Sequence, residues 1–181
     1  MSHAPQPATS APSLDALYRE HVRFAWRTAR YLGVPAADAQ DVVHEIFIVV
    51  QRRLPDFDPK RSARAWIGGI TRHVVLHHKR SHARAENRVA RLEPPTDTTP
   101  SPDDAVSRRE AEAFLTAFLD SLPQPKREAF VLGELENLTA AEIGEVVGEN
   151  PNTVYSRLRS ARQAFQASVD RLDARRRREG G

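Results

Sequence analysis

Apolar residues recur at helical spacing along most of the chain, whereas sustained alternation of apolar and polar residues is missing. In the first half the pattern predicts helices at residues 14–32, 38–54 and 63–81. Gly33, closely followed by Pro35, ends the first helix, and Pro55 ends the second. The second helix is apolar around most of its circumference, so we expect it at the centre of its domain. The fold class is therefore all-α.

In the second half, the pattern predicts helices at residues 107–121 and 125–136, followed by two short helices inside LTAAEIGEVVGENPNTVYSRLRSAR, residues 138–162. Thr139 precedes Glu142 by three positions, which predicts a capping box at a helix start. Gly148 permits the left-handed backbone of a helix end, and Asn150 can cap the helix that follows. The missing side chain of Gly144 should let the first short helix approach its neighbour closely. Two short helices joined by a tight turn are thus expected.

The second short helix has a narrow apolar stripe and a broad polar face. Its stripe is Val154, Leu158, Ala161 and Phe165. Arginine and asparagine side chains on a helix start can reach base edges and phosphates in a DNA major groove. The pattern favours a DNA-binding helix-turn-helix over its alternative, a helical hairpin with a solvated arginine face. The candidate DNA-binding residues are Asn152, Thr153, Tyr155, Ser156, Arg157, Arg159 and Arg162.

The stretch RLEPPTDTTPSPDD, residues 91–104, has four prolines and almost no apolar residues. It predicts a flexible, proline-rich linker between two small helical domains. The division that follows is a disordered tail at 1–13, a first domain at 14–90, a linker at 91–105, a second domain at 106–173 and a basic tail at 174–181. The arginines of the basic tail are expected to be solvated or to serve as auxiliary phosphate contacts.

Composition narrows the function classes only slightly. The net charge is +3, and residues 13–84 hold 13 Lys and Arg against 7 Asp and Glu. This surplus suits a polyanionic partner, although surfaces that bind nothing often carry as much. The chain has no cysteine and no apolar run long enough to cross a membrane, so we expect a cytoplasmic protein without disulfides and without membrane insertion.

Residues 138–162 resemble the DNA-binding end of bacterial sigma factors, whose usual form is L-[ST]-x-x-E-I-A-x-x-x-G, a turn, then T-V-x-S-R-L-x-R-A-R. Matches include Leu138, Glu142 and the Thr153-Val154 pair. Three positions depart from the form, namely Gly144 for alanine, Asn152 for a frequent glycine and Ser160 for a basic residue. Asn152 is the departure most apt to give this chain its own preference.

The first half carries a second sigma-factor resemblance. DAQDVVHEIFIVVQRRL is similar to D-A-E-D-x-x-Q-E-x-F, and RSARAWIGGITRHVVLHHKR is similar to F-R-x-W-L-x-x-I-A-R-N-x-x-x-D-x-x-R-R. His73 and His77 replace an asparagine and an aspartate of that form. Two motifs in the right order, over residues 14–172, resemble the extracytoplasmic function (ECF) group of the sigma-70 family. The resemblance implies a protein that binds core RNA polymerase, reads minus-10 with the first domain and minus-35 with the second, and helps open the DNA.

The resemblance also implies which residues bind the polymerase. An acidic face on the second helix would dock on the clamp helices of the β′ subunit, and the β flap is a further expected contact. Acids in a first helical turn also complement the helix dipole without any partner, so for Asp38 both readings stay open. The expected polymerase-binding residues are Asp38, Asp41, Glu45, Phe47 and Gln51.

The loop at 56–62 and the third helix should meet the minus-10 strand. Strand opening requires unstacked bases to be trapped, and Phe57 or Trp66 could stack on one, although Trp66 fits the apolar core better. Basic residues can pair with phosphates or base edges. The expected minus-10 residues are Phe57, Lys60, Arg61, Arg64, Arg72, His73, His77, Lys79 and Arg80.

Other functions find less support in the sequence. His73 and His77 share a helical face, but no cysteine or carboxylate accompanies them on that helix, so no metal and no cofactor is expected. No credible acid, base or ligand cluster suggests an enzyme. A stand-alone helix-turn-helix regulator that binds operator DNA remains the alternative. Promoter DNA and core polymerase are the expected partners, and an anti-sigma factor is a further one that the resemblance allows.

Overall fold

The structure, a computed structural model, describes residues 12–89 and 104–179, with side chains described for 12–82 and 110–178. Its elements, in order, are α1 (Leu14–Tyr31), α2 (Ala39–Arg53), the 3-10 turn η1 (Leu54–Asp56), α3 (Ala63–Val89), α4 (Asp104–Ser121), α5 (Gln124–Phe130), the π-helical turn η2 (Val131–Leu135), α6 (Ala140–Val147) and α7 (Pro151–Glu179). No strand occurs within the described ranges, which confirms the all-α prediction. The predicted tail at 1–13 and linker at 91–105 lie almost wholly outside them.

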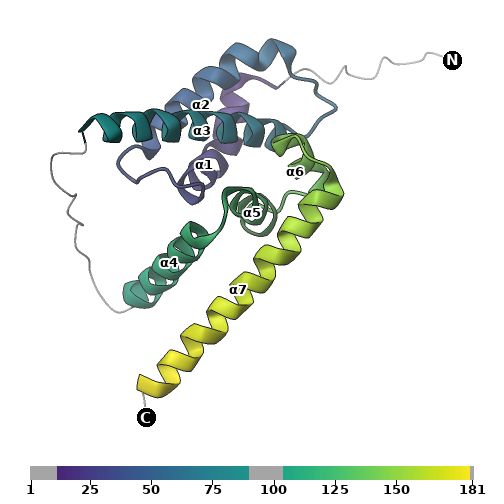
Figure 1. Ribbon diagram of the computed structural model, residues 1–181. Helices are drawn as coiled ribbons and strands as arrows, with labels where there is room; N and C mark the ends of the chain where they lie inside the picture. The colour runs from purple at the N-terminus through teal and green to yellow at the C-terminus, as the bar shows by residue number, and fades with distance from the viewer. Residues whose placement is uncertain (1–11, 90–103, 180–181) are drawn as a thin grey trace.

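The first half is a three-helix unit in which α1, α2 and α3 all pack against one another (Figure 1). The Ser13 hydroxyl caps α1 by accepting from the Ala16 amide at 3.2 Å, and Gly33, at φ +101°, ends it. The inner side of α2 buries Val42, Ile46 and Val50, which are at most 1% exposed. Its other side is exposed at Asp41, Glu45 and Gln51, so the central place that the sequence predicted for this helix is not confirmed.

The second half packs α4 and α5 against α7 through aromatic rings. Phe118 of α4 lies 5.2 Å from Phe130 of α5 and 5.0 Å from Phe165 of α7, between ring centroids. The far end of α7 runs away from the first half with α4 beside it (Figure 1), and there Arg176 pairs with Glu110 at 3.1 Å. The residues predicted as a basic tail therefore continue α7 as far as Glu179.

The helix-turn-helix forms as the sequence predicts. Thr139 and Glu142 make the capping box, with the Thr139 amide donating to the Glu142 carboxylate at 2.9 Å. Gly148 ends α6 with φ +74°, and the Asn150 side chain accepts from the Asn152 amide at 2.8 Å. A Cβ on Gly144 would lie 2.7 Å from the backbone oxygen of Glu149, so the expected close approach is confirmed.

The helix predicted at 125–136 is interrupted. It leaves α-helical geometry after Phe130 and widens into η2, and the chain then turns through Asn137 at φ +56°. The Glu136 amide donates to the Val131 carbonyl at 3.0 Å, a five-residue span that an α-helix would not make. This wide turn places Glu136 at the end of the helix, on the side that faces the first half.

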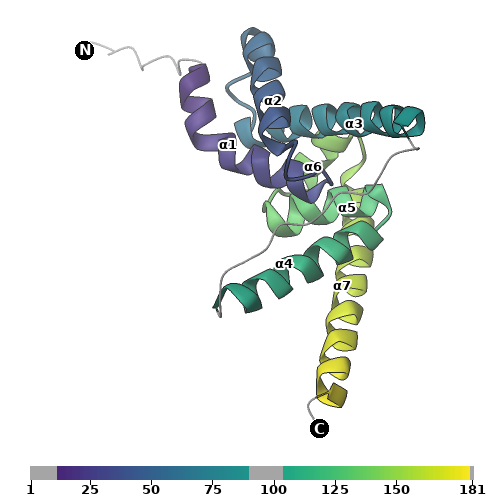
Figure 2. The same cartoon turned by 90° about the vertical axis from the view of Figure 1, so that its left-hand side faces the viewer.

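The two halves pack directly against each other, which the sequence did not predict. In both ribbon views, α1 and α3 lie against η2 and α6 (Figures 1 and 2). Gly68 of α3 lies at this contact, where a Cβ would be at ordinary van der Waals distance from Val146, at 3.6 Å, and from Leu138, at 3.9 Å. Buried apolar residues of both halves form one continuous core.

Candidate nucleic-acid interface

The N-terminal part of α7 separates buried and exposed side chains as a recognition helix would. Val154, Leu158 and Ala161 are at most 5% exposed, whereas Tyr155 is 62% exposed. The predicted minus-35 residues that stand exposed around Tyr155 are Asn152, Ser156, Arg159 and Arg162. Thr153 is half-buried.

Two of the predicted minus-35 arginines have acidic partners in their own half. Arg157 pairs with Glu149 at 2.7 Å, and Arg162 pairs with Glu134 at 2.7 Å. The carboxylate raises the pKa of Arg162 further above its ordinary value. The carboxylates of Glu149 and Glu134 thus fix the positions of the two guanidinium groups, which lie beside the exposed face of the helix.

Three of the predicted minus-10 arginines have acidic partners in the other half. Arg61 Nη2 lies 2.5 Å from Glu145 Oε2, and Arg72 Nε lies 2.9 Å from Glu128 Oε2. Arg64 pairs with Glu136 at 2.9 Å. These contacts bring an expected DNA-binding surface against the acidic side of the second half.

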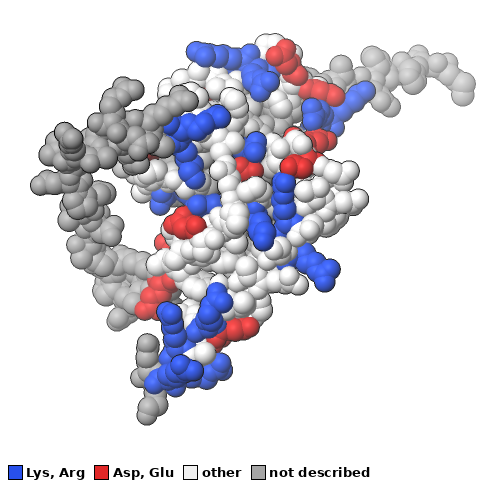
Figure 3. Space-filling model, viewed as in Figure 1, with Lys and Arg blue, Asp and Glu red and all other residues white. Residues whose placement is uncertain are grey.

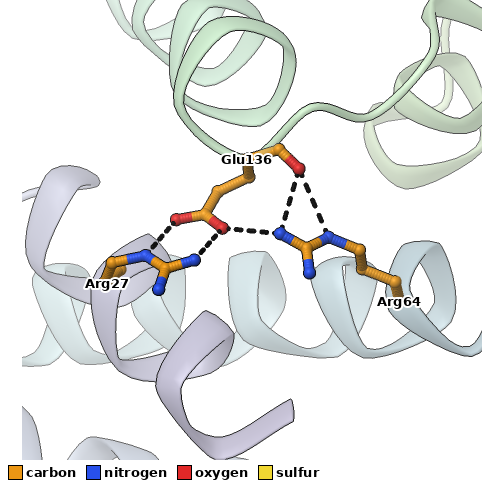
Figure 4. A network of polar contacts seen from close by, with 3 residues as sticks. All are labelled: Arg27, Arg64 and Glu136. Atoms are coloured by element: carbon orange, nitrogen blue, oxygen red, sulfur yellow. Dashed lines mark hydrogen bonds and ion pairs between the residues drawn. The ribbon is translucent and has the colours of Figure 1, made fainter. Parts of the chain in front are cut away.

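Glu136 is the centre of the densest polar network (Figure 4). Its carboxylate, whose side chain is 0% exposed, accepts from Arg27 Nε at 3.0 Å and Nη2 at 2.8 Å, and from Arg64 Nη2 at 2.9 Å. Its backbone oxygen accepts two further bonds from Arg64, at 3.0 and 3.2 Å. The Arg64 guanidinium also stacks 4.4 Å above the Phe24 ring. Two charged donors therefore compensate one buried carboxylate.

Arg27 and Glu136 were not among the residues predicted from the sequence. They are 109 positions apart, and neither lies at a helical spacing from its partner. The one local signal was the presence of Gly133 and Asn137 on either side of Glu136. These residues indicate an irregular helix end, but they do not indicate which way the Glu136 side chain points.

The remaining cationic minus-10 residues lie along the loop and α3. Lys60, His73, His77 and Arg80 are exposed. Lys79 donates to the Leu32 carbonyl at 3.3 Å, and burial, with the nearby Arg127, lowers the pKa of its amine. Lys79 thus ties α3 to the end of α1 in this structure.

The structure does not support Phe57 as a base-stacking platform. Its ring is only 7% exposed and lies 4.7 Å from the Trp66 ring, between centroids. The loop folds back because this aromatic pair closes the core below η1. An exposed face for a base would require Phe57 to leave that packing, so its role at minus-10 stays a prediction.

The predicted polymerase-binding face of α2 is partly open. Asp41, Glu45 and Gln51 are exposed. Phe47 is 7% exposed and lies against Tyr18, with ring centroids 4.7 Å apart, and its expected contact with polymerase stays a prediction. Tyr18 itself is 46% exposed beside it.

Asp38 has histidine neighbours that the sequence did not bring together. Its Oδ2 lies 3.3 Å from His78 Nε2 and 3.5 Å from His82 Nε2. On α3, His78 and His82 thus meet a carboxylate, whereas His73 and His77 are exposed. One carboxylate oxygen serves both rings, which holds the start of α2 against α3.

Charges of both signs are interspersed over the face shown in Figure 3. Blue side chains gather at the far end of α7, where Arg176, Arg177 and Arg178 fall in its last turn. Across the middle of this face, red side chains stand next to blue ones. A continuous basic surface is therefore absent from this face of the described chain.

Comparison with protein families matches two models. Residues 17–85 match sigma-70 region 2, and residues 114–165 match sigma-70 region 4. A probable RNA polymerase sigma-C factor of Mycobacterium bovis is 30% identical over 158 residues, which cover 87% of this chain and 84% of the relative. The chain belongs to the ECF group of the sigma-70 family. The ECF sigma factor SigE of Mycolicibacterium smegmatis is 33% identical over 157 residues, covering 86% of this chain and 61% of that relative.

Solved sigma factors share the fold. CnrH, solved in complex with the cytosolic domain of CnrY, superposes with a TM-score of 0.65 at 25% identity over 87% of each chain. RpoE of Bartonella quintana, in complex with the anti-sigma factor NepR, gives a TM-score of 0.70 at 18% identity over 84% of this chain and 94% of that one. The second likeness concerns the fold alone.

The protein is thus an RNA polymerase sigma factor, which binds core polymerase and directs promoter-specific initiation of transcription. The comparisons give no support to the alternative of a stand-alone regulator. Among the described helices, none is long and apolar enough to cross a membrane.

Proposed function

We propose that α7 reads the minus-35 element with the side chains of its first turns. The observation that carries this proposal is the division of α7 into a buried stripe at Val154, Leu158 and Ala161 and an exposed polar face, on a capped helix-turn-helix. Asn152, Tyr155 and Arg159 stand on that exposed face and are the proposed base-reading residues. Thr153, Ser156, Arg157 and Arg162 are proposed to position the helix on the phosphates.

A promoter library tests these roles. The protein with core polymerase is used to transcribe templates randomised in the minus-35 element. Replacing Asn152 or Arg159 by alanine should change which sequences are preferred, because a base contact contributes to one position only. Replacing Arg162 should weaken all templates alike. A uniform loss from Asn152→Ala and Arg159→Ala would refute the assignment of base reading to these residues.

For minus-10, the proposal places phosphate contacts on the cationic side of α3 and its preceding loop. Support comes from the spacing of Arg64 and Arg72, two helical turns apart on one face, and from exposed Lys60, His73, His77 and Arg80. Arg61 stands in the loop just before them. Arg64→Ala should reduce the formation of heparin-resistant complexes on a duplex promoter. The reduction should be smaller on a promoter whose minus-10 element is already melted, because Arg64 is proposed to help trap the separated strand.

For polymerase, the proposed docking residues are Asp41, Glu45 and Gln51, the exposed members of the α2 face. Asp38 joins them only in part, because its carboxylate is shared with two histidines. Reversing charge with Asp41→Lys and Glu45→Lys should weaken binding to core polymerase. The exposed carboxylate pair Asp15 and Glu20 on α1 supplies a control of equal charge change.

Three broader assignments belong to the same proposal. The protein acts in the cytoplasm, where its polymerase is, and it acts by binding without catalysing a reaction of its own. An anti-sigma factor is a further proposed partner, since CnrH, at 25% identity, was likewise solved with a second protein, the cytosolic domain of CnrY. Isolation of the chain from its native cells with core polymerase or with such an inhibitor would test both partnerships.

A further inference from the structure

Asp38, His78 and His82 bring one carboxylate and two imidazole rings together in the first half. Asp38 Oδ2 lies 3.3 Å from His78 Nε2 and 3.5 Å from His82 Nε2. One ligand atom of each residue lies within 4.8 Å of those of the other two. Among the side chains that the structure describes, these are the one group of histidines and acids close enough to share a metal ion.

The two histidines lie one helical turn apart in the segment HKRSH of α3. Residues at this spacing leave the same face of a helix. The His78 and His82 rings are 4.3 Å apart between centroids, and both Nε2 atoms approach the same oxygen. A pair of histidines four positions apart on a helix is how many zinc proteins supply two of their metal ligands.

Asp38 supplies the carboxylate from a different helix. It stands just before α2, where an aspartate normally accepts a hydrogen bond from an amide of its own helix. The Asp38 side chain makes no such bond, and its carboxylate meets the α3 histidines instead. No metal was expected from the sequence because no carboxylate accompanies His73 and His77 on their predicted helix. The fold brings one to His78 and His82 from another segment.

The distances fit a shared metal ion better than hydrogen bonds. A charged N–H donor and a carboxylate oxygen usually lie about 2.7–2.9 Å apart, which is shorter than either contact here. Four tetrahedral ligands that bind Zn²⁺ at about 2.0–2.1 Å lie about 3.3–3.4 Å from one another. Six octahedral ligands at about 2.1 Å would lie about 3.0 Å apart. The observed 3.3 and 3.5 Å are thus closest to the edges of a tetrahedral site.

The types of ligand and their exposure indicate which ion would bind. Two imidazole nitrogens with one carboxylate oxygen suit Zn²⁺, whereas Mg²⁺ and Ca²⁺ prefer oxygen ligands throughout. The side chains of His78, Asp38 and His82 are 17%, 29% and 50% exposed, so solvent reaches the group beside His82. An ion can enter from that side, and water can take the fourth position of the tetrahedron.

We propose that Asp38, His78 and His82 bind one Zn²⁺ ion, with water as its fourth ligand. The ion links the start of α2 to α3, next to the face of α2 that is proposed to dock on polymerase. Asp38 then acts as a metal ligand and not as a polymerase contact. This inference does not depend on the DNA and polymerase roles proposed above.

The first test measures metal binding to the full-length protein without an affinity tag. Calorimetry follows ZnCl₂, and visible absorption follows Co²⁺, which adopts the same tetrahedral geometry as Zn²⁺. The parent should bind one ion of either metal and give the spectrum of tetrahedral Co²⁺. Binding with another stoichiometry, or a Co²⁺ spectrum of six-coordinate type, would overturn the proposed site.

A variant with His78→Ala and His82→Ala is compared with a control that carries His73→Ala and His77→Ala. The control removes two exposed histidines at the same spacing on the same helix. Loss of an outer-shell partner alone weakens metal binding about 10–100-fold, so loss of the two ligands should weaken it at least about tenfold. The control should bind Zn²⁺ like the parent. Equal affinity of variant and control would refute the assignment to His78 and His82.

Asp38→Asn tests the third ligand and disturbs the packing least, because it removes the charge of the carboxylate and keeps its shape. This variant should bind Zn²⁺ at least about tenfold more weakly than the parent and lose the tetrahedral Co²⁺ spectrum. It keeps the test decisive if the double-histidine variant does not regain the helical circular dichroism of the parent. Unchanged binding by Asp38→Asn would show that the carboxylate is not a ligand.

The second test follows stability. An ion that binds the folded protein alone lowers the unfolding equilibrium constant about 100-fold when its free concentration is 100 times its dissociation constant. Added Zn²⁺ should therefore raise the thermal midpoint of the parent and of the His73→Ala, His77→Ala control, and it should leave that of Asp38→Asn unchanged. An equal rise in Asp38→Asn would mean that Zn²⁺ stabilises the protein from another place, and it would contradict the proposal.

Discussion

Replacing Glu136 by alanine should uncouple the two halves of the protein. The change removes a fully buried carboxylate that accepts three side-chain hydrogen bonds from Arg27 and Arg64. Each charged hydrogen bond contributes about 1.5–3 kcal/mol, but the arginines are 42% and 38% exposed and can regain water. The arginines' exposure reduces the net loss, and we expect about 2–3 kcal/mol.

The two tryptophans make this loss measurable one half at a time. Trp26 and Trp66 both belong to the first half, so tryptophan fluorescence follows that half, whereas far-UV circular dichroism follows helices of both. In urea, the two signals of the parent protein should change together, because the halves share one core. In Glu136→Ala they should separate into two transitions.

The control is Glu134→Ala, two positions away. Glu134 pairs with Arg162 in its own half, and that pair is part-exposed, so its loss should cost at most about 1 kcal/mol and leave the two signals coincident. The reasoning would be refuted if the two variants lost the same stability, or if Glu136→Ala kept a single coincident transition.

Three further predictions concern stability. Gly144→Ala should destabilise the protein by about 1–3 kcal/mol, because its Cβ would lie 2.7 Å from a backbone oxygen. Gly69→Ala, whose Cβ would meet nothing within 4 Å, should stabilise it by up to about 1 kcal/mol. Urea unfolding of the two variants compares these free energies. Burial lowers the pKa of His21 in the folded protein, so the unfolded chain takes up a proton on His21 at higher pH than the folded protein does, and stability should fall as pH drops below 6.5. His21→Leu should reduce this dependence of stability on pH. An unchanged dependence would exclude His21 as its cause. Thr139→Ala should cost about 1 kcal/mol by removing the cap of α6, and a loss as small as that of an exposed control such as Thr116→Ala would show that the capping box is not stabilising.

Local features of the fold were predictable because short-range chemistry determines them. Apolar spacing gave the helices, and the Thr139 capping box and Gly148 gave the ends of α6. The exposed face of α7 followed from its buried stripe. Arg64 and Arg72 lie on α3, the helix that the spacing predicted, and their role at minus-10 stays a prediction.

Long-range features were not predictable. Glu136 contacts Arg27 across 109 positions, and nothing local in either residue indicates the other. The π-helical turn that aims Glu136 depends on packing between the halves. Phe57 was expected in an exposed loop, but whether a loop aromatic folds inward depends on a partner such as Trp66, which the sequence leaves unplaced.

The most direct test of the account is transcription by the purified protein with core polymerase. Transcript starts are mapped in cells that overproduce the protein, and one of the promoters found is transcribed in vitro. The account predicts specific initiation that requires both the protein and core polymerase, and that is lost with Asp41→Lys and Glu45→Lys. Specific binding of that promoter by the protein alone, with no initiation when core polymerase is added, would contradict it.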